Sequence, residues 1–268
     1  MAQNATAVGD AFRDLIATMA RLRGAQGCPW DKEQTHASLK PFLLEETYEL
    51  LEAIDRGEPG EMEEELGDLL HQIIFHCQIG AEKELFNAET VVSRLKDKLI
   101  RRHPHVFSDR DLPDSDTVLK HWAKTKAEEN ETKKSATSLG DPPRSMPALA
   151  RAQRVGERAS YVGFDWPGPD QVWEKIEEEL NELKKALSSR DQRRVQEEMG
   201  DLLFTLVNLC RFFDFQAEEA LSQAVDRFLR RFAHIETRIR ERGRTLAETT
   251  LEEMDSLWEE AKTVERRS

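Results

Sequence analysis

Residues 173–215 read WEKIEEELNELKKALSSRDQRRVQEEMGDLLFTLVNLCRFFDF, which is two helical segments joined by a short polar break. With about 3.6 residues per turn, side chains three or four positions apart lie on one face of a helix. Glu179 and Glu182 therefore project together from the first segment. Glu198 and Asp201 project together from the second. If the two helices pack antiparallel, these four carboxylates converge.

Converging carboxylates favour a bound cation. Like charges at this spacing repel by a few tenths of a kcal/mol per pair on an exposed helix, and more strongly as water is excluded. Ligands that are all oxygen favour Mg²⁺ over zinc, with Mn²⁺ as a second possibility. The stretch therefore predicts a divalent metal site.

The alternative is an ordinary solvated acidic face, which needs no ligand. If Ser189 or Asp191 caps the second helix, Glu198 and Asp201 lie about two turns inside it, beyond the reach of the helix dipole. Gly200 lies mid-helix, where glycine costs about 1 kcal/mol relative to alanine. We therefore expect something to approach its backbone closely, which argues against a plain solvated face.

The same acidic pattern occurs earlier in the chain. A shift of 133 positions places four residues on the four acids above, and these residues are Glu46, Glu49, Glu65 and Asp68. Two halves that repeat the same four acids are poorly explained as chance solvated faces, and internal repetition indicates a duplicated structural unit.

Basic and aromatic residues repeat as well. A shift of 129 positions places Lys98 and Arg102 on Arg227 and Arg231. A shift of 136 positions places Trp122 and Lys126 on Trp258 and Lys262. Beside a carboxylate-bound metal, such basic residues are candidate phosphate ligands. The alternatives are surface salt bridges for the basic pairs and core packing, rather than base stacking, for the tryptophan.

Composition limits the possible classes of protein. The 268 residues include 39 basic and 52 acidic residues, and the formal net charge of −13 argues against broad binding to nucleic acid or to an anionic membrane. The three cysteines form neither a metal-ligand spacing nor a disulfide framework. No apolar run is long enough to span a bilayer, and the N-terminus does not resemble a signal peptide. We expect a cytoplasmic protein.

The chain reads as two helical domains, since apolar residues recur at helical spacing and strand patterns are scarce. We predict an all-α fold with a first domain at residues 1–126 and a second at residues 148–268. Residues 127–147 carry charged residues, serine, threonine and proline with almost nothing apolar. They are expected to form a flexible linker.

Several of these motifs resemble a known family. The acidic pattern in both halves, the segments at residues 27–31 and 98–107, and the Leu257-Trp258-x-x-Ala261-Lys262 motif resemble the two-domain MazG nucleoside triphosphate pyrophosphohydrolases. The resemblance covers nearly the whole chain except the first few residues and the linker. It implies an all-α fold of two tandem helical domains, Mg²⁺ dependence, homodimerisation, and hydrolysis of NTPs or dNTPs to the monophosphate and pyrophosphate.

The resemblance also implies roles for single residues. The metal ligands would be Glu179, Glu182, Glu198 and Asp201. The phosphates would be faced by Lys175, Arg227, Arg231 and Lys262, and the nucleotide by Trp258. A second set would comprise Glu46, Glu49, Glu65, Asp68, Lys98, Arg102, Trp122 and Lys126. Glu178, next to the ligands but off their face, is a candidate to orient the attacking water, although an ordinary surface glutamate fits nearly as well.

Two further readings stay open at this point. One is a non-catalytic helical dimeric adaptor, whose acidic faces serve partner contacts only. The other is a diphosphatase restricted to a single deoxynucleotide. Stacking on one tryptophan tolerates any base, so the sequence does not decide the base preference.

Overall fold

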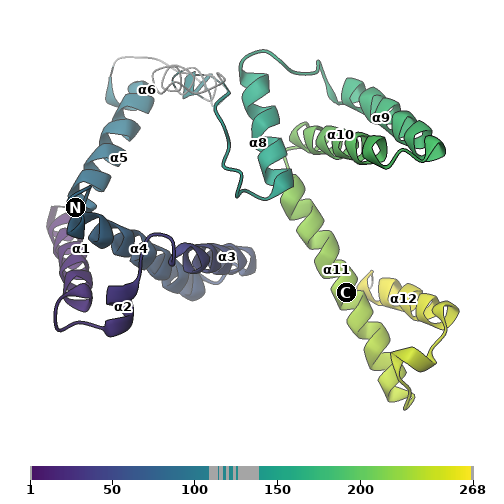
Figure 1. Cartoon of the computed structure of the whole chain (residues 1–268), viewed down its shortest axis with the longest axis horizontal. Helices are drawn as coiled ribbons and strands as arrows, with labels where there is room; N and C mark the ends of the chain where they lie inside the picture. The colour runs from purple at the N-terminus through teal and green to yellow at the C-terminus, as the bar shows by residue number, and fades with distance from the viewer. Residues whose placement is uncertain are drawn as a thin grey trace. The chain divides into compact units, whose positions relative to one another are not determined.

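The computed structural model describes residues 2–108 and 139–266, and between them residues 114, 117, 118, 121, 122 and 125. All regular elements in these residues are helices (Figure 1), so the prediction of an all-α fold is confirmed. None of the described helices combines the length and the hydropathy that a bilayer crossing requires.

The chain forms two compact units, Met1–Asp111 and Leu112–Ser268. This division falls before residue 126, where the first domain was predicted to end. Most of the predicted linker, with Lys126 before it, lies outside the described residues, so the linker stays a prediction. Its described end, residues 139–147, contains no helix, and the next helix begins at Ala148.

The first unit contains six helices in the described residues. They are α1 (Ala2–Arg23), α2 (Pro29–Glu33), α3 (Lys40–Arg56), α4 (Pro59–Glu82), α5 (Ala88–Arg102) and α6 (Pro104–Phe107). α3 and α4 form a hairpin, because Gly57 ends α3 in the left-handed conformation and Pro59 opens α4. α1 packs against α4 and buries Met19 and Phe75 in the core of the unit. This packing fixes the position of the hairpin.

The second unit repeats the hairpin. Its described elements are α8 (Ala148–Tyr161), α9 (Pro169–Ser189), α10 (Gln192–Arg211), α11 (Ala217–Glu241), the short 3-10 helix η1 (Leu246–Glu248) and α12 (Leu251–Glu265). α9 ends at Arg190, which has a positive φ of 54°, and Asp191 caps α10 by accepting hydrogen bonds from the backbone N–H groups of Arg193 and Arg194. Of the two capping residues considered from the sequence, Ser189 and Asp191, Asp191 is therefore the one that caps α10.

Two apolar clusters hold the second unit together. Val172, Ile176 and Leu183 of α9 pack against Leu202 of α10. A separate cluster joins α11 and α12 around Ile235, Ile239 and Leu257. Figure 1 shows α12 beside the half of α11 that lies farther from the α9–α10 hairpin. The hairpin and the α11–α12 pair are therefore two distinct parts of this unit.

α8 contacts α10 at a glycine. A Cβ atom added to Gly156 would lie 2.3 Å from Oδ1 of Asn208. Asn208 is fully buried, and its side chain is fixed because Nδ2 donates to the carbonyl of Phe204 at 2.9 Å and Oδ1 accepts from Nε of Arg211 at 3.0 Å. The close approach of the two helices therefore requires a residue without a side chain at position 156.

We expect Gly156→Ala to lower the free energy of unfolding by about 1–3 kcal/mol, because the methyl group overpacks a site that cannot relax. The control is Gly9→Ala at an exposed position of α1, where an added Cβ meets nothing within 4 Å. There we expect no loss and a gain of up to about 1 kcal/mol from helix propensity. Urea unfolding followed by circular dichroism measures both changes, and equal losses at the two positions would contradict this account.

Candidate metal centre

The second unit brings three carboxylates together. Glu179 and Glu182 project from one face of α9, and Glu198 projects toward them from α10. One oxygen of each lies within 4.8 Å of one oxygen of the other two. Glu179 is buried and the other two are half-buried. We call these three residues the second triad.

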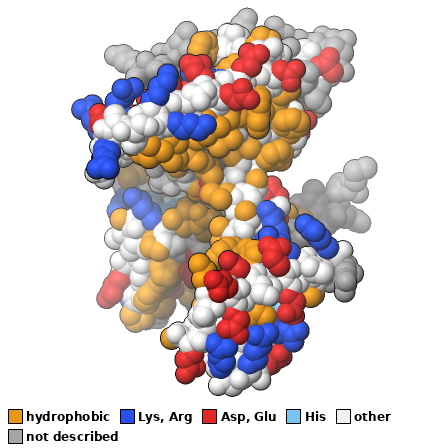
Figure 2. Space-filling view, turned by 90° about the vertical axis from the view of Figure 1, so that its right-hand side faces the viewer, with side chains coloured by type: hydrophobic (Ala, Val, Ile, Leu, Met, Phe, Trp, Pro, Cys, Tyr) orange, Lys and Arg blue, Asp and Glu red, His pale blue; other side chains and the backbone are white. Residues whose placement is uncertain are grey.

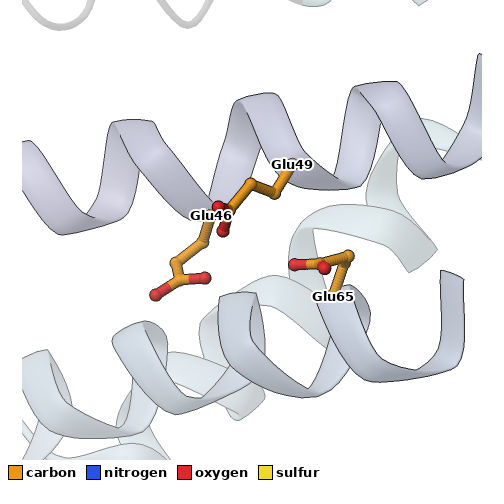
Figure 3. A group of neighbouring side chains, drawn as sticks. All are labelled: Glu46, Glu49 and Glu65. Carbon is orange, nitrogen blue, oxygen red and sulfur yellow. The ribbon is translucent and has the colours of Figure 1, made fainter. Parts of the chain in front are cut away.

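The first unit has the equivalent group, the first triad. Figure 3 shows Glu46 and Glu49 extending from α3 and Glu65 extending from α4 into the space between the two helices. Their oxygens meet the same 4.8 Å spacing. In both units the one-turn spacing on the first helix and the tight hairpin connection produce the convergence, as the sequence pattern indicates.

The two aspartates predicted as fourth ligands, Asp68 and Asp201, do not share this spacing. Each follows the glutamate of its helix by three positions, and its side chain is one methylene shorter than that of a glutamate. Their charges nevertheless reach the triads. The pKa of Glu46 is raised by burial first and then by Asp68. Asp201 adds a smaller contribution to the raised pKa of Glu198.

Burial and mutual repulsion both oppose ionisation of the triad carboxylates. Burial raises the pKa of Glu65, and the charge of Glu49 adds to the effect. Burial also raises the pKa of Glu198, and Glu182 is the next contribution. In each case the neighbouring carboxylates oppose the ionised form. A divalent cation removes this opposition, and a set of carboxylate oxygens is the donor set that hard cations such as Mg²⁺ and Mn²⁺ prefer.

Basic side chains reach the second triad. Nζ of Lys175 lies 2.7 Å from Oε1 of Glu179 and 2.9 Å from Oε1 of Glu178, and these contacts raise the pKa of the lysine, that with Glu179 most. Nη2 of Arg194 lies 3.6 Å from Oε1 of Glu198. Lys175, predicted to face phosphates, thus pairs with carboxylates here. Sequence reasoning missed Arg194, although its position four residues before Glu198 was a usable signal.

The other predicted phosphate residues of the second half gather elsewhere. A pocket between α11 and α12 is lined by Arg227, Arg230, Arg231, Lys262, Val264, Glu265 and Arg266. Figure 1 shows α12 beside α11 and apart from the α9–α10 hairpin. The pocket therefore has the charge expected of an anion site, but it contains no member of the second triad.

Two of the predicted substrate-binding residues, Arg231 in this pocket and Trp258 beside it, already contact other side chains. The guanidinium of Arg231 pairs with Glu265 at 2.7 Å and lies over the ring of Trp258, 5.4 Å from its centroid. The indole also packs against Phe228, with the ring centroids 5.1 Å apart. Trp258 is thus half-buried in the α11–α12 cluster, which is the packing arrangement considered as the alternative to base stacking.

The equivalent residues of the first half lie after the α3–α4 hairpin. Lys98 and Arg102 are half-buried on α5, and Trp122 is half-buried farther along the chain. Lys126 lies outside the described residues.

The expectation for Gly200 is wrong within this chain. No described atom lies within 4 Å of a Cβ built on Gly200, and the same holds for its equivalent Gly67. Both glycines lie on a face of their helix that no other described helix covers. The helix-propensity cost at these positions has no explanation in the packing of the single chain.

Comparison with known proteins identifies the repeated unit. The sequence profile of the MazG nucleotide pyrophosphohydrolase domain matches residues 34–107 and again residues 168–235. This chain belongs to the MazG family. Each MazG match contains one complete triad, so the prediction of two tandem MazG domains is confirmed. α12, with Trp258 and Lys262, lies beyond the second match.

Two of the similar proteins match this chain over nearly their full length, and a third does so over about half of its length. The chain is 48% identical over 254 residues to the nucleoside triphosphate pyrophosphohydrolase/pyrophosphatase MazG of Thermotoga maritima, covering 95% of this chain and 96% of that protein. It is 44% identical over 253 residues to the nucleoside triphosphate pyrophosphohydrolase of Escherichia coli K12, covering 92% and 95%. The uncharacterized protein YabN of Bacillus subtilis is 45% identical over 258 residues, covering 96% of this chain and 52% of that protein.

We expect a divalent cation to stabilise the folded chain, by about 2.7 kcal/mol at a free concentration one hundred times its dissociation constant. Glu49→Gln removes both a ligand and a like charge, so in EDTA we expect this variant to be a few tenths of a kcal/mol more stable than the wild type. In Mg²⁺ the gain in stability of this variant over the wild type should be smaller. Thermal unfolding measures both, and the control is Glu63→Gln, an exposed residue of α4 in the same hairpin. Identical stability in EDTA and Mg²⁺ would contradict a metal role.

Proposed function

We propose that Glu179, Glu182, Glu198 and Asp201 bind Mg²⁺, with Mn²⁺ as a substitute, and that this centre serves the hydrolysis of nucleoside triphosphates. The chain is a nucleoside triphosphate pyrophosphohydrolase, which cleaves the bond between the α- and β-phosphates and releases the monophosphate and pyrophosphate. The observation that carries the metal assignment is the convergence of three carboxylates in each MazG domain. An adaptor without catalysis gives no reason for that duplicated convergence.

The cation, when bound, neutralises charge on the phosphates and favours an ionised water. The protein residues supply position and charge. The two helices hold the three carboxylates at fixed spacing, because apolar packing beneath them fixes the hairpin. Lys175 can exchange its bond with Glu179 for a phosphate oxygen. Glu178 stays our prediction for orienting the water, and in this structure its carboxylate accepts a hydrogen bond from Lys175.

Phosphate binding is assigned to the pocket between α11 and α12. Arg227, Arg231 and Lys262 line it, and guanidinium groups match phosphate oxygens in charge and geometry. They stabilise the departing pyrophosphate by position and charge. Lys98 and Arg102 are the corresponding candidates in the first domain. We further propose a cytoplasmic location, in keeping with three free cysteines and a nucleotide substrate.

We expect Glu182→Gln to lower turnover about 100-fold or more, because the loss of a carboxylate weakens the metal that stabilises the transition state by roughly 3 kcal/mol. The control is Glu197→Gln, an exposed residue of the same hairpin that pairs with Arg193. Pyrophosphate release is measured for the eight common NTPs and dNTPs, which also tests restriction to one deoxynucleotide. Equal turnover in the two variants would contradict the assignment.

The same apolar stripe is exposed in both domains. On α11 it consists of Leu221, Val225, Phe228 and Leu229, and on α5 of Val92, Leu95, Leu99 and Ile100. The α9–α10 hairpin adds Leu180, Leu187, Met199, Leu203 and Leu206. Figure 2 shows such side chains gathered in its upper part, where the hairpin lies, and charged side chains in the lower part.

We propose that a second copy of the chain covers these faces. Contiguous exposed apolar surface of this kind marks an interface. The open faces of Gly67 and Gly200 lie on the same hairpins. A second copy also offers a way to bring an α11–α12 pocket toward a triad, which the described single chain does not do. The proposed active form is therefore a homodimer.

We expect the wild type to have a molar mass in solution of twice the chain mass of 30.9 kDa. Leu221→Asp combined with Leu229→Asp should shift it to the monomer, since each places a charge in the apolar interface. The control is Leu251→Asp on α12, an exposed leucine outside the stripe. Light scattering coupled to size exclusion gives the masses, and a monomeric wild type would overturn the dimer.

A further inference from the structure

The two triads share their carboxylates but not their neighbours. The shift of 133 positions that superimposes the triads also places Phe42 on Lys175 and Glu61 on Arg194. One domain therefore has an apolar and an acidic residue at the positions where the other has two basic residues. Both positions lie one helical turn before a triad glutamate.

In the second domain the two basic residues reach the triad. Lys175 pairs with Glu179 at 2.7 Å, and the side chain of Glu179 is only 6% exposed. Arg194 lies 3.6 Å from Glu198. Two of the three carboxylates thus already have a cationic partner in the chain itself.

In the first domain the equivalent residues face other partners. Phe42 packs at the edge of the core and meets Trp30 edge to face, with the ring centroids 5.7 Å apart. Glu61 pairs with Arg56 at 2.7 Å. The nearest polar partner of Glu46 is the neutral amide of Gln72, whose Nε2 donates at 3.5 Å. In the described part of the chain, every ion pair of a triad carboxylate belongs to the second domain.

This difference changes the cost of taking up a metal ion. In the first triad a dication meets carboxylates that repel one another, and nothing has to leave. In the second triad a dication competes with Lys175 for Glu179, the largely buried one of the two carboxylates that pair with this ammonium group. Its other partner, Glu178, is exposed. A triphosphate supplies an anion that can replace Glu179.

We propose that the first triad binds its divalent cation in the absence of nucleotide, and that the second triad takes up its cation together with the nucleotide, when Lys175 passes from Glu179 to a phosphate oxygen. This inference rests on the metal role of both triads stated above. It assigns Lys175 a second role, because its ion pair with Glu179 competes with free metal until the nucleotide binds.

The test is Mn²⁺ binding to the full-length protein, measured by electron paramagnetic resonance of the free ion. Without nucleotide we expect two classes of site whose affinities differ about tenfold or more, the effect of one charge-assisted hydrogen bond. Glu49→Gln should remove the tight class, and Glu182→Gln the weak class. Adding ATP with a methylene group between the α- and β-phosphorus atoms should tighten the weak class only.

Lys175→Met isolates the lysine. We expect it to tighten the weak class about tenfold without nucleotide and to abolish the further tightening by the ATP analogue. Lys184→Met, which removes the same charge from an exposed position of α9, should change neither. The converse variant Phe42→Lys should weaken the tight class. Phe42 packs against the core, so this change also tests folding. If Phe42→Lys does not fold, the Lys175→Met result alone tests the inference.

The outcomes separate this inference from the proposed function. Equal affinity of the two classes, or no effect of Lys175→Met, would overturn the inference while the metal role stands. If Glu49→Gln and Glu182→Gln both leave Mn²⁺ binding unchanged, the metal role of the triads falls and the inference falls with it.

Discussion

Repulsion between carboxylates held across a helical hairpin is the constraint on which this structure depends. Three side chains of like charge approach within 4.8 Å because the helices beneath them are fixed by apolar packing, not because the carboxylates attract one another. Leu183 and Leu202 belong to the apolar cluster that joins α9 to α10. The hydrophobic core thus supplies the free energy that keeps a charge cluster assembled, and the cluster in turn provides strong attraction for a dication.

The same hairpin explains the exposed apolar surface. One side of α9–α10 packs inward, another carries the carboxylates, and a third leaves Met199 and Leu203 in solvent. A two-helix hairpin has too little surface to bury three such faces alone. The phosphate-binding candidates Arg227 and Lys262 lie on other helices. The proposed dimer and the proposed phosphate binding therefore both require residues from outside the hairpin to be brought onto it.

The sequence allowed the repeat, the helices and both triads to be predicted, because spacing along a helix fixes which side chains share a face. It did not predict that Asp68 and Asp201, on the same helix faces, lie outside the 4.8 Å spacing of the triads. It also could not decide between competing partners. Trp258 packs on Phe228 and Lys175 pairs with Glu179 in the chain without ligand, and such choices depend on the tertiary neighbours.

The comparison of Phe42 with Lys175 indicates how the two domains can differ in chemistry without differing in fold. A lysine has a long apolar stem and a charged end, so it can lie along a helix face where phenylalanine packs in the other domain and still place its ammonium at the rim. At this position the two domains differ by one unit of charge, and both have the same hairpin. The ligands themselves cannot vary in this way, because each carboxylate belongs to the convergent set. Divergence between the domains is therefore expected one helical turn away from the ligands, which is where Phe42, Glu61, Lys175 and Arg194 lie.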